Sequence, residues 1–183
     1  MGGGNNITEE AKKIISEQMK KSICQINGGT GFFCLMHYPD TCNLLPVLIT
    51  SNKILNENDL EIGNKINILL NNGEKTIEIE IDDERIVKII SECEIAIVEI
   101  RKNELDVNTF LLIDENIDKE DSSIIYKEKP IYLMYYSKKK ETKYNKGEVI
   151  SIERDKKNLE IKIKDEDNPQ GCTIINLVNY TVI

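Results

Sequence analysis

The stretch LLPVLITSNKIL, residues 44–55, decides how the fold of this chain is assigned. Its residues 45–51 are mostly apolar or β-branched, which predicts a short strand. A polar segment follows, so that Lys53 stands just beyond the end of that strand. The only histidine of the chain, His37, lies elsewhere in the sequence. The stretch therefore predicts a strand that is followed by a lysine, and not by the histidine of the chain.

Short β-rich runs continue on both sides of this stretch, separated by Gly, Asn and Asp. The run 75–81 alternates, with isoleucines on one face and polar or acidic residues on the other. Asn71-Asn72-Gly73 is a hairpin signal between two of the runs. The spacing of the runs predicts two antiparallel β-barrels in tandem. The predicted strands are 22–26, 30–37, 45–51, 65–71, 75–82, 94–100, 131–136, 144–153, 158–164, 172–177 and a last run that ends at Ile183.

One helix is predicted before the first strand, near residues 8–20. Thr8 can cap it, and Glu9 and Glu10 suit the positive N-terminal end of the helix dipole. Lys20 and Lys21 suit the negative C-terminal end. The apolar side chains recur at helical spacing and form one face that we expect to pack on the barrel, namely Ala11, Ile14, Ile15 and Met19.

The composition is that of an ordinary globular chain. Its 183 residues, 40% of them apolar and 31% charged, suffice for one sizeable domain or for two small barrels that share a core. The net charge is −8 and the pI is about 4.9. Nucleic acid and anionic membranes would be repelled by this charge, so neither is expected as the main partner. No apolar run approaches ~18 residues, and no transmembrane helix is expected.

The N-terminus and the cysteines indicate a cytoplasmic protein. Residues 1–6 lack the apolar region of a signal peptide. Gly2 is only part of a myristoylation signal, because Asn6 stands where Ser or Thr is required, so we expect no lipid anchor. The cysteines are odd in number and lack CxxC spacing, which favours reduced, buried thiols over disulfides or zinc; they are Cys24, Cys34, Cys42, Cys93 and Cys172.

Four segments, in order, carry a resemblance to a known family. SICQI (residues 22–26) with GTGFFC (29–34) is similar to the opening of trypsin-like peptidases, and LITSNK (48–53) to their histidine strand. ECEIAIVEI (92–100) is similar to the strand that carries the catalytic aspartate, and GCTIIN (171–176) to the strand that follows the catalytic serine. The chain from residue 22 to 183 thus resembles the trypsin-like, chymotrypsin-fold serine peptidases.

The same resemblance implies a degenerate catalytic triad. Lys53 stands at the histidine, Glu94 at the aspartate and Gln170 at the serine. Gln170 has no nucleophilic atom, and a lysine with an ordinary pKa of roughly 10.4 is a cation at neutral pH. We expect Lys53 and Glu94 to form an ion pair. Asn168 replaces a glycine that helps to form the oxyanion hole, and Asn168, Gly171 and Cys172 are the candidate residues of a binding cleft.

Two alternatives remain open at this point. In one, Cys172 is a rearranged nucleophile, as in chymotrypsin-fold cysteine proteases, but this requires a two-residue shift of the matching strand and provides no histidine. In the other, the chain is a structural subunit of a larger assembly that uses its barrel surface. His37 is expected at a strand end or in a loop, and the acidic cluster 165–167 in solvent, so no metal or cofactor is expected.

The sequence therefore predicts an all-β protein with a chymotrypsin-like double antiparallel β-barrel and a short N-terminal helix. The expected divisions are a tail and helix over 1–21, a first barrel over 22–105 and a second barrel over 106–183. Relatives continue past the residues matching Val182-Ile183, so the second barrel is expected to be incomplete, truncated or completed by another chain. The expected function is that of a catalytically inactive pseudoprotease that binds a protein or peptide partner, or serves as a scaffold.

Overall fold

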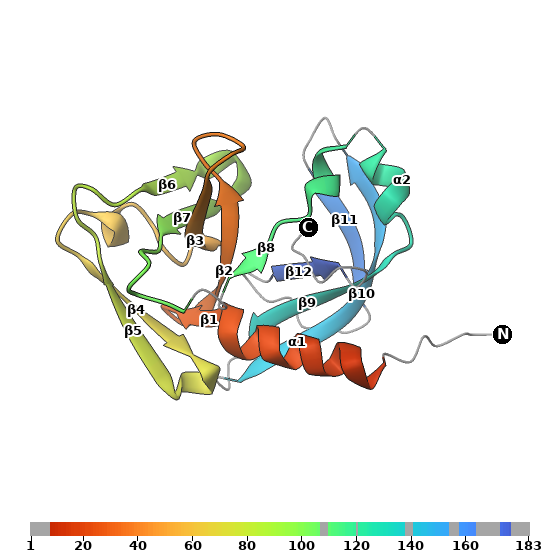
Figure 1. Ribbon diagram of the computed structural model, residues 1–183, viewed down its shortest axis with the longest axis horizontal. Helices are drawn as coiled ribbons and strands as arrows, with labels where there is room; N and C mark the ends of the chain where they lie inside the picture. The colour runs from red at the N-terminus through yellow and green to blue at the C-terminus, as the bar shows by residue number, and fades with distance from the viewer. Residues whose placement is uncertain are drawn as a thin grey trace.

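The fold contains two β-sheets that lie side by side (Figure 1). The computed structural model describes residues 8–106, 110–119, 121–137, 141–153, 158–163 and 173–176. The strands of the first sheet are β1 (Ile23–Ile26), β2 (Gly29–His37), β3 (Leu44–Ser51), β4 (Lys65–Leu70), β5 (Lys75–Glu80), β6 (Val87–Ile90), β7 (Ile95–Glu99) and β8 (Leu111–Leu112). Those of the second sheet are β9 (Pro130–Tyr136), β10 (Thr142–Glu153), β11 (Asn158–Ile163) and β12 (Thr173–Asn176).

Both sheets are antiparallel along their main paths. The first has the order β5-β4-β1-β2-β3-β7-β6, and β8 adds to β2 in parallel, with Cys34 paired to Leu111. The second has the order β11-β10-β9-β12. The described residues also form α1 (Glu9–Ser22), α2 (Ser122–Tyr126) and short 3-10 turns at Asn58–Leu60 (η1), Asn71–Gly73 (η2), Ser91–Cys93 (η3) and Glu115–Asp118 (η5).

The predicted N-terminal helix is confirmed as α1. The Thr8 hydroxyl oxygen accepts a hydrogen bond from the backbone N–H of Ala11 at 3.2 Å, as expected of a cap. The helix ends at Ser22, two residues later than predicted, and the chain passes directly into β1. Ile15 and Met19 of the predicted apolar face are buried.

Most predicted strands are present with ends shifted by one or two residues, and η2 forms the predicted turn between β4 and β5. Asn72 and Gly73 there adopt positive φ angles of 57° and 86°, which Asn and Gly tolerate. Besides 3-10 turns, two strands and one helix of the described residues were not predicted, namely β6, β8 and α2. Each is at most five residues long, and β6 and β8 owe their strand conformation to pairing with β7 and β2. Sequence pattern is weak at such lengths.

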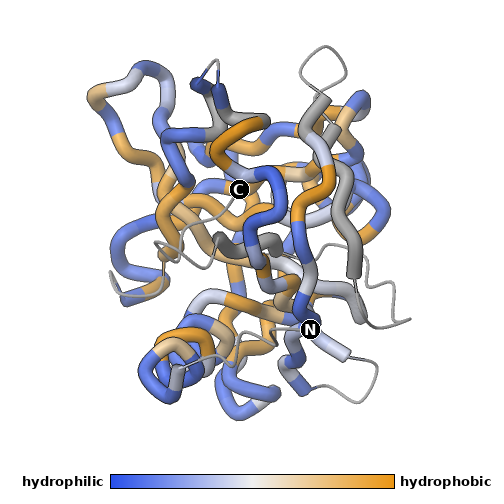
Figure 2. Tube along the Cα trace, turned by 90° about the vertical axis from the view of Figure 1, so that its right-hand side faces the viewer, coloured by the Kyte–Doolittle hydropathy of each residue, from blue (hydrophilic) through white to orange (hydrophobic). Residues whose placement is uncertain are grey.

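The described residues form two apolar cores. The first lies within the first sheet and includes Phe33, Leu48 and Ile68. The second joins α1 to both sheets, because Ile15 packs in one cluster with Val47 of β3 and Tyr132 of β9. Figure 2 shows the hydrophobic segments running through the interior strands, with hydrophilic segments in the outer turns. The helix packs where the two sheets meet.

A buried polar contact also connects the sheets. Thr30 of β2 accepts a hydrogen bond from the backbone N–H of Tyr136 in β9 at 2.8 Å through its hydroxyl oxygen. Thr50 of β3 donates its own hydroxyl hydrogen to the backbone carbonyl of Thr30 at 2.8 Å. Both threonines are buried, so these groups have no access to water. Together the two hydrogen bonds connect β9 to β2 and β2 to β3, the strand that leads to Lys53.

Candidate functional site

The backbone brings the end of β3 next to the start of β7. Ser51 pairs with Ile95, and one residue beyond this pair the N–H of Asn52 donates to the carbonyl of Glu94 at 2.9 Å. Glu94 follows η3 and has a left-handed φ of 55°, which turns the chain into β7. Lys53 lies in the turn after β3, where its N–H donates to the Ser51 hydroxyl oxygen at 3.2 Å. Two residues 41 positions apart are thus presented at one end of the sheet.

The predicted ion pair between these residues is confirmed. Lys53 Nζ lies 2.6 Å from Glu94 Oε2. The side chains are 54% and 58% exposed, respectively. Each charge is therefore still in contact with water. An ammonium group held by a carboxylate in this way is a hydrogen-bond donor and has no lone pair with which to accept a proton.

The remaining predicted site residues lie outside the described part of the chain. Asn168, Gln170, Gly171 and Cys172 all precede β12, which begins at Thr173. The described strand itself is antiparallel to β9, with Ile174 paired to Leu133. The placement of these four residues relative to Lys53 and Glu94 therefore stays a prediction, as does the division of the chain at residue 105.

Glycine in the GTGFF segment permits close packing beside the Lys53 turn. A Cβ atom at Gly29 would overlap Cδ1 of Ile54, the residue that follows Lys53, and would lie 2.6 Å from its Cγ1. A Cβ at Gly31 would lie 2.6 Å from Cδ1 of Ile26. Real Cβ contacts are longer than this, so any side chain at Gly29 would displace Ile54.

The cysteines only partly follow the expectation of buried thiols. Cys24 and Cys34 are buried, and burial raises the pKa of each thiol well above its usual value. Cys42 and Cys93, in contrast, are exposed. All four are free thiols, whereas Cys172 lies outside the described residues. His37 is exposed at the end of β2, as predicted. No group of three or more His, Cys, Asp and Glu side chains that could hold a metal is found among residues the structure describes.

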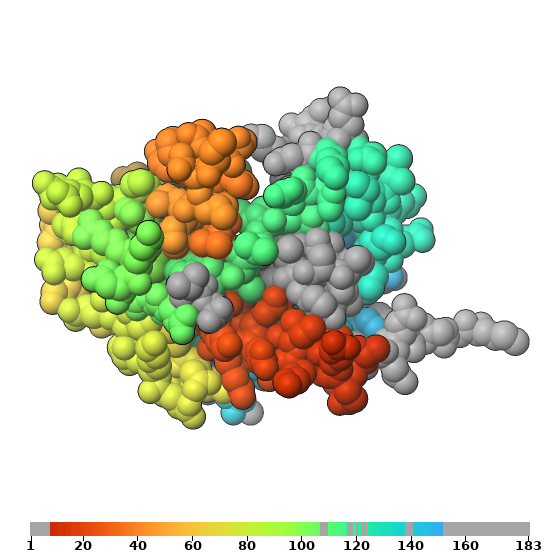
Figure 3. Space-filling view, in the orientation of Figure 1, coloured from red at the N-terminus to blue at the C-terminus, as the bar shows by residue number. Residues whose placement is uncertain are grey.

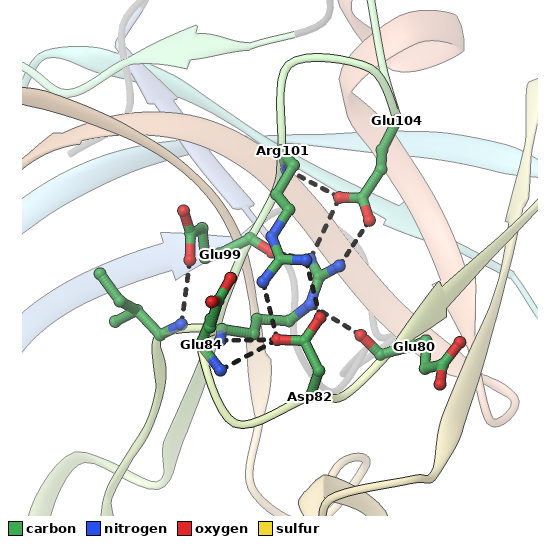
Figure 4. Close-up of polar contacts among 8 residues, drawn as sticks. Glu80, Asp82, Glu84, Glu99, Arg101 and Glu104 are labelled. Atoms are coloured by element: carbon green, nitrogen blue, oxygen red, sulfur yellow. Dashed lines mark hydrogen bonds and ion pairs between the residues drawn. The ribbon is translucent and has the colours of Figure 1, made fainter.

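Sequence reasoning missed a cluster of charged side chains on the first sheet (Figure 4). Its centre is Arg85, whose side chain is 2% exposed and which follows β5. Arg85 Nη2 and Nη1 donate to the Glu104 carboxylate at 2.5 and 3.1 Å. Its guanidinium also donates to the backbone carbonyls of Glu80 and Glu99 at 2.8 and 2.6 Å. Arg85 therefore connects the ends of β5 and β7 to each other and to the Glu104 side chain.

A second pair completes this cluster. Arg101 donates from both terminal nitrogens to the Asp82 carboxylate, each at 2.7 Å. These hydrogen bonds lower the pKa of Asp82 and raise that of Arg101. Burial alone would raise the pKa of Glu104, but hydrogen bonds from Arg85 and from the Arg101 N–H bring it below its usual value. The partners come from separate loops, so no local sequence pattern could have revealed the cluster.

Comparisons with known proteins identify the fold. No protein-family model matches the chain, and no curated protein matches it. Among solved structures, Deg5 is similar with a TM-score of 0.59 and 11% identity, over 96% of this chain and 84% of that one. The Rv3671c protease in its inactive form is similar with a TM-score of 0.59 and 14% identity, over 100% of this chain and 85% of that one.

These similarities confirm the predicted fold class. The chain has an all-β, chymotrypsin-like fold with a helix at its N-terminus, and its structural neighbours are trypsin-like serine proteases. At this level of identity the similarity concerns the fold alone, and a fold hosts many functions. No helix in the described part of the chain has the length and apolar character needed to span a membrane.

Proposed function

We propose that this protein is a catalytically inactive, trypsin-like pseudoprotease that acts as a binding or scaffold module for a protein or peptide. The observation that carries the proposal is the 2.6 Å contact between Lys53 and Glu94. In the resemblance drawn from the sequence, these residues stand where a trypsin-like protease has its general base and the carboxylate that orients it. The predicted loss of the nucleophile at Gln170 belongs to the same proposal.

The chemistry of the pair supports this function over peptide hydrolysis. A general base must be unprotonated near neutral pH and must lie within hydrogen-bond reach of the nucleophile. The side chain of Lys53 is exposed to water and donates a hydrogen bond to the Glu94 carboxylate. Glu94 in turn holds a cation instead of orienting an imidazole. The pair stabilises a local structure, and it has no means of activating a hydroxyl or thiol group.

The proposed partner is an extended polypeptide. Peptidases of this fold bind substrate by adding it as a strand, and that binding mode requires no catalytic triad. Loss of the triad would therefore leave a cleft that holds a peptide without cutting it. The candidate cleft residues remain Asn168, Gly171 and Cys172, as proposed from the sequence.

Turnover of a broad fluorogenic peptide library, together with a fluorophosphonate probe, tests the absence of activity. We expect no turnover and no fluorophosphonate labelling of the purified protein. A cysteine-reactive probe alone would be ambiguous, because Cys42 and Cys93 are exposed thiols. The assay is therefore run on the Cys42→Ser, Cys93→Ser double variant. Turnover that is lost on Cys172→Ala would establish the hydrolase alternative and overturn the proposal.

A gain-of-function variant tests the assignment of the three positions. The triple variant Lys53→His, Glu94→Asp, Gln170→Ser restores the side chains of a trypsin-like triad. Labelling of this variant by a fluorophosphonate, but not of the matched variant that retains Lys53, would support the assignment. Pull-downs with the cleft variant Gly171→Arg and with surface variants then separate a cleft-binding module from a structural subunit that uses its outer surface.

A further inference from the structure

A pocket of about 340 Å³ lies beside the β2–β3 hairpin of the first sheet. The β2–β3 hairpin forms one wall, and the segment of β8 and η5 forms the other. Figure 3 shows this hairpin in orange beside the green segment that holds β8. Four aliphatic side chains line the pocket, namely Leu35, Leu44, Leu112 and Ile113.

Three of the four aliphatic side chains in this lining are exposed. Leu44 is 52% exposed and Leu112 is 54% exposed, and Ile113 beside them is also exposed. Tyr38, a further exposed hydrophobic residue, follows the pocket residue His37 directly in sequence. Apolar side chains that gather at one concave place on a surface mark an interaction site more often than single exposed ones do.

The polar residues of the lining give the pocket a negative charge. Among the described residues that line it, Asp114 and Glu115 are acidic and none is lysine or arginine. Asp114 is buried in the wall, where its carboxylate accepts hydrogen bonds from the Asn116 backbone N–H at 3.0 Å and from its side-chain amide at 2.9 Å. Burial, together with this carboxylate, raises the pKa of Tyr126. Glu115 is exposed at the rim and accessible to a partner.

This pocket is separate from the Lys53–Glu94 pair. Leu44 begins β3 and Lys53 follows its end, so the two sites lie at opposite ends of a strand of eight residues. At about 3.3 Å per residue, the strand separates them by roughly 25 Å. The two sites therefore share no residue.

We propose that this pocket binds a polypeptide segment in which aliphatic side chains alternate with arginine or lysine. The aliphatic side chains pack against Leu44 and Leu112, and a neighbouring cation reaches the Glu115 carboxylate. The net charge of −8 steers a basic partner toward this molecule and disfavours an acidic one. This binding does not depend on whether the triad positions are catalytic.

Fluorescence anisotropy with three labelled peptides at 150 mM NaCl tests the proposal. The first contains the core Leu-Arg-Leu-Arg, the second replaces Arg by Glu, and the third replaces Leu by Ser. We expect only the first to bind the wild-type protein. Leu112→Asp and Glu115→Lys should each weaken its binding at least tenfold, and Glu115→Lys should gain binding to the Leu-Glu peptide.

Two matched variants control for general charge attraction. Ile62→Asp and Glu61→Lys make the same changes at exposed positions that do not line the pocket, and they should change the affinity by less than twofold. Equal binding by all four variants, or failure of the first peptide to bind, would overturn the proposal. A dimer in sedimentation velocity that dissociates in Leu112→Asp would also overturn it, because the occupant would then be a second copy of this chain.

Discussion

Lys53 Nζ and Glu94 Oε2 lie 2.6 Å apart, yet more than half of each side chain is exposed to solvent. The short distance and the solvent exposure have opposite effects on how much the pair stabilises the folded protein. Proximity gives a well-formed charge-assisted hydrogen bond, whereas water screens both charges in the folded protein and solvates them fully when the pair is broken. The pair is therefore expected to contribute little to the stability of the fold.

A double-mutant cycle should find weak coupling between these residues. With Lys53→Met and Glu94→Gln, we expect a coupling free energy of about 0.2–1 kcal/mol, because exposed ion pairs contribute little. Urea unfolding of the wild type, both single variants and the double variant measures it. The larger loss expected of a buried pair, roughly 3–5 kcal/mol, does not apply to this exposure. Coupling above about 2 kcal/mol would contradict the description of the pair as solvent-screened.

Loss of Arg85 or Glu104 should be far more damaging. Removing one partner of a buried ion pair leaves an uncompensated charge, so Glu104→Gln and Arg85→Met should each lower the free energy of unfolding by roughly 3–5 kcal/mol. The matched control is Lys65→Met, which breaks the exposed pair with Glu78 and should cost less than about 1 kcal/mol. Similar losses for Lys65→Met and Arg85→Met would show that burial does not set the difference.

The Asp82–Arg101 pair should contribute to acid sensitivity. Because Arg101 lowers the pKa of Asp82 in the folded state, this contribution is fully present above the unfolded pKa of about 3.9. It is lost as the pH falls through the lower, folded pKa. Wild-type stability should therefore decrease more steeply below about pH 4 than that of Asp82→Asn, with little difference in slope between pH 5 and 7. Parallel curves below pH 4 would argue against the lowered pKa.

Thr30 should hold the two sheets together through its hydroxyl group. Thr30→Val keeps the shape of the side chain but leaves the backbone N–H of Tyr136 without its acceptor, which should cost about 1–3 kcal/mol. Amide hydrogen exchange should show faster exchange at Tyr136 in this variant. Thr76→Val, at an exposed position of β5, is the control and should leave that amide unchanged. Unchanged exchange at Tyr136 in Thr30→Val would mean that the hydrogen bond is not made.

Gly29 should tolerate no side chain while Ile54 is present. Gly29→Ala brings a methyl group onto Ile54, and overpacking of this kind costs about 1–3 kcal/mol. Ile54→Val removes the Cδ1 atom that the methyl would overlap, so the double variant should be less destabilised than the sum of the two single variants. Strict additivity in urea unfolding would show that the two positions do not contact.

The sequence alone determined the elements whose signals are local and long. Alternation over 75–81, the turn residues Asn72 and Gly73, and the cap Thr8 all predicted what the fold contains, because each depends on neighbours in the chain. The order of the four family-like segments predicted the chymotrypsin-like fold, and it also led to the expected contact between Lys53 and Glu94. Strands as short as β6 and β8 escaped prediction, since their conformation depends on a partner strand rather than on their own residues.

Only the tertiary structure decided which charged side chains are exposed to solvent and which are buried. Lys53 and Arg85 are both cations in turns that follow strands, and nothing in their local sequence separates them. The fold leaves the first side chain 54% exposed and the second 2% exposed. It likewise brings Leu44 and Leu112 to one pocket although they lie far apart in the chain. Exposure and the meeting of distant residues depend on how the sheets and loops pack, and that packing sets whether a charge is screened by water or held in a buried network.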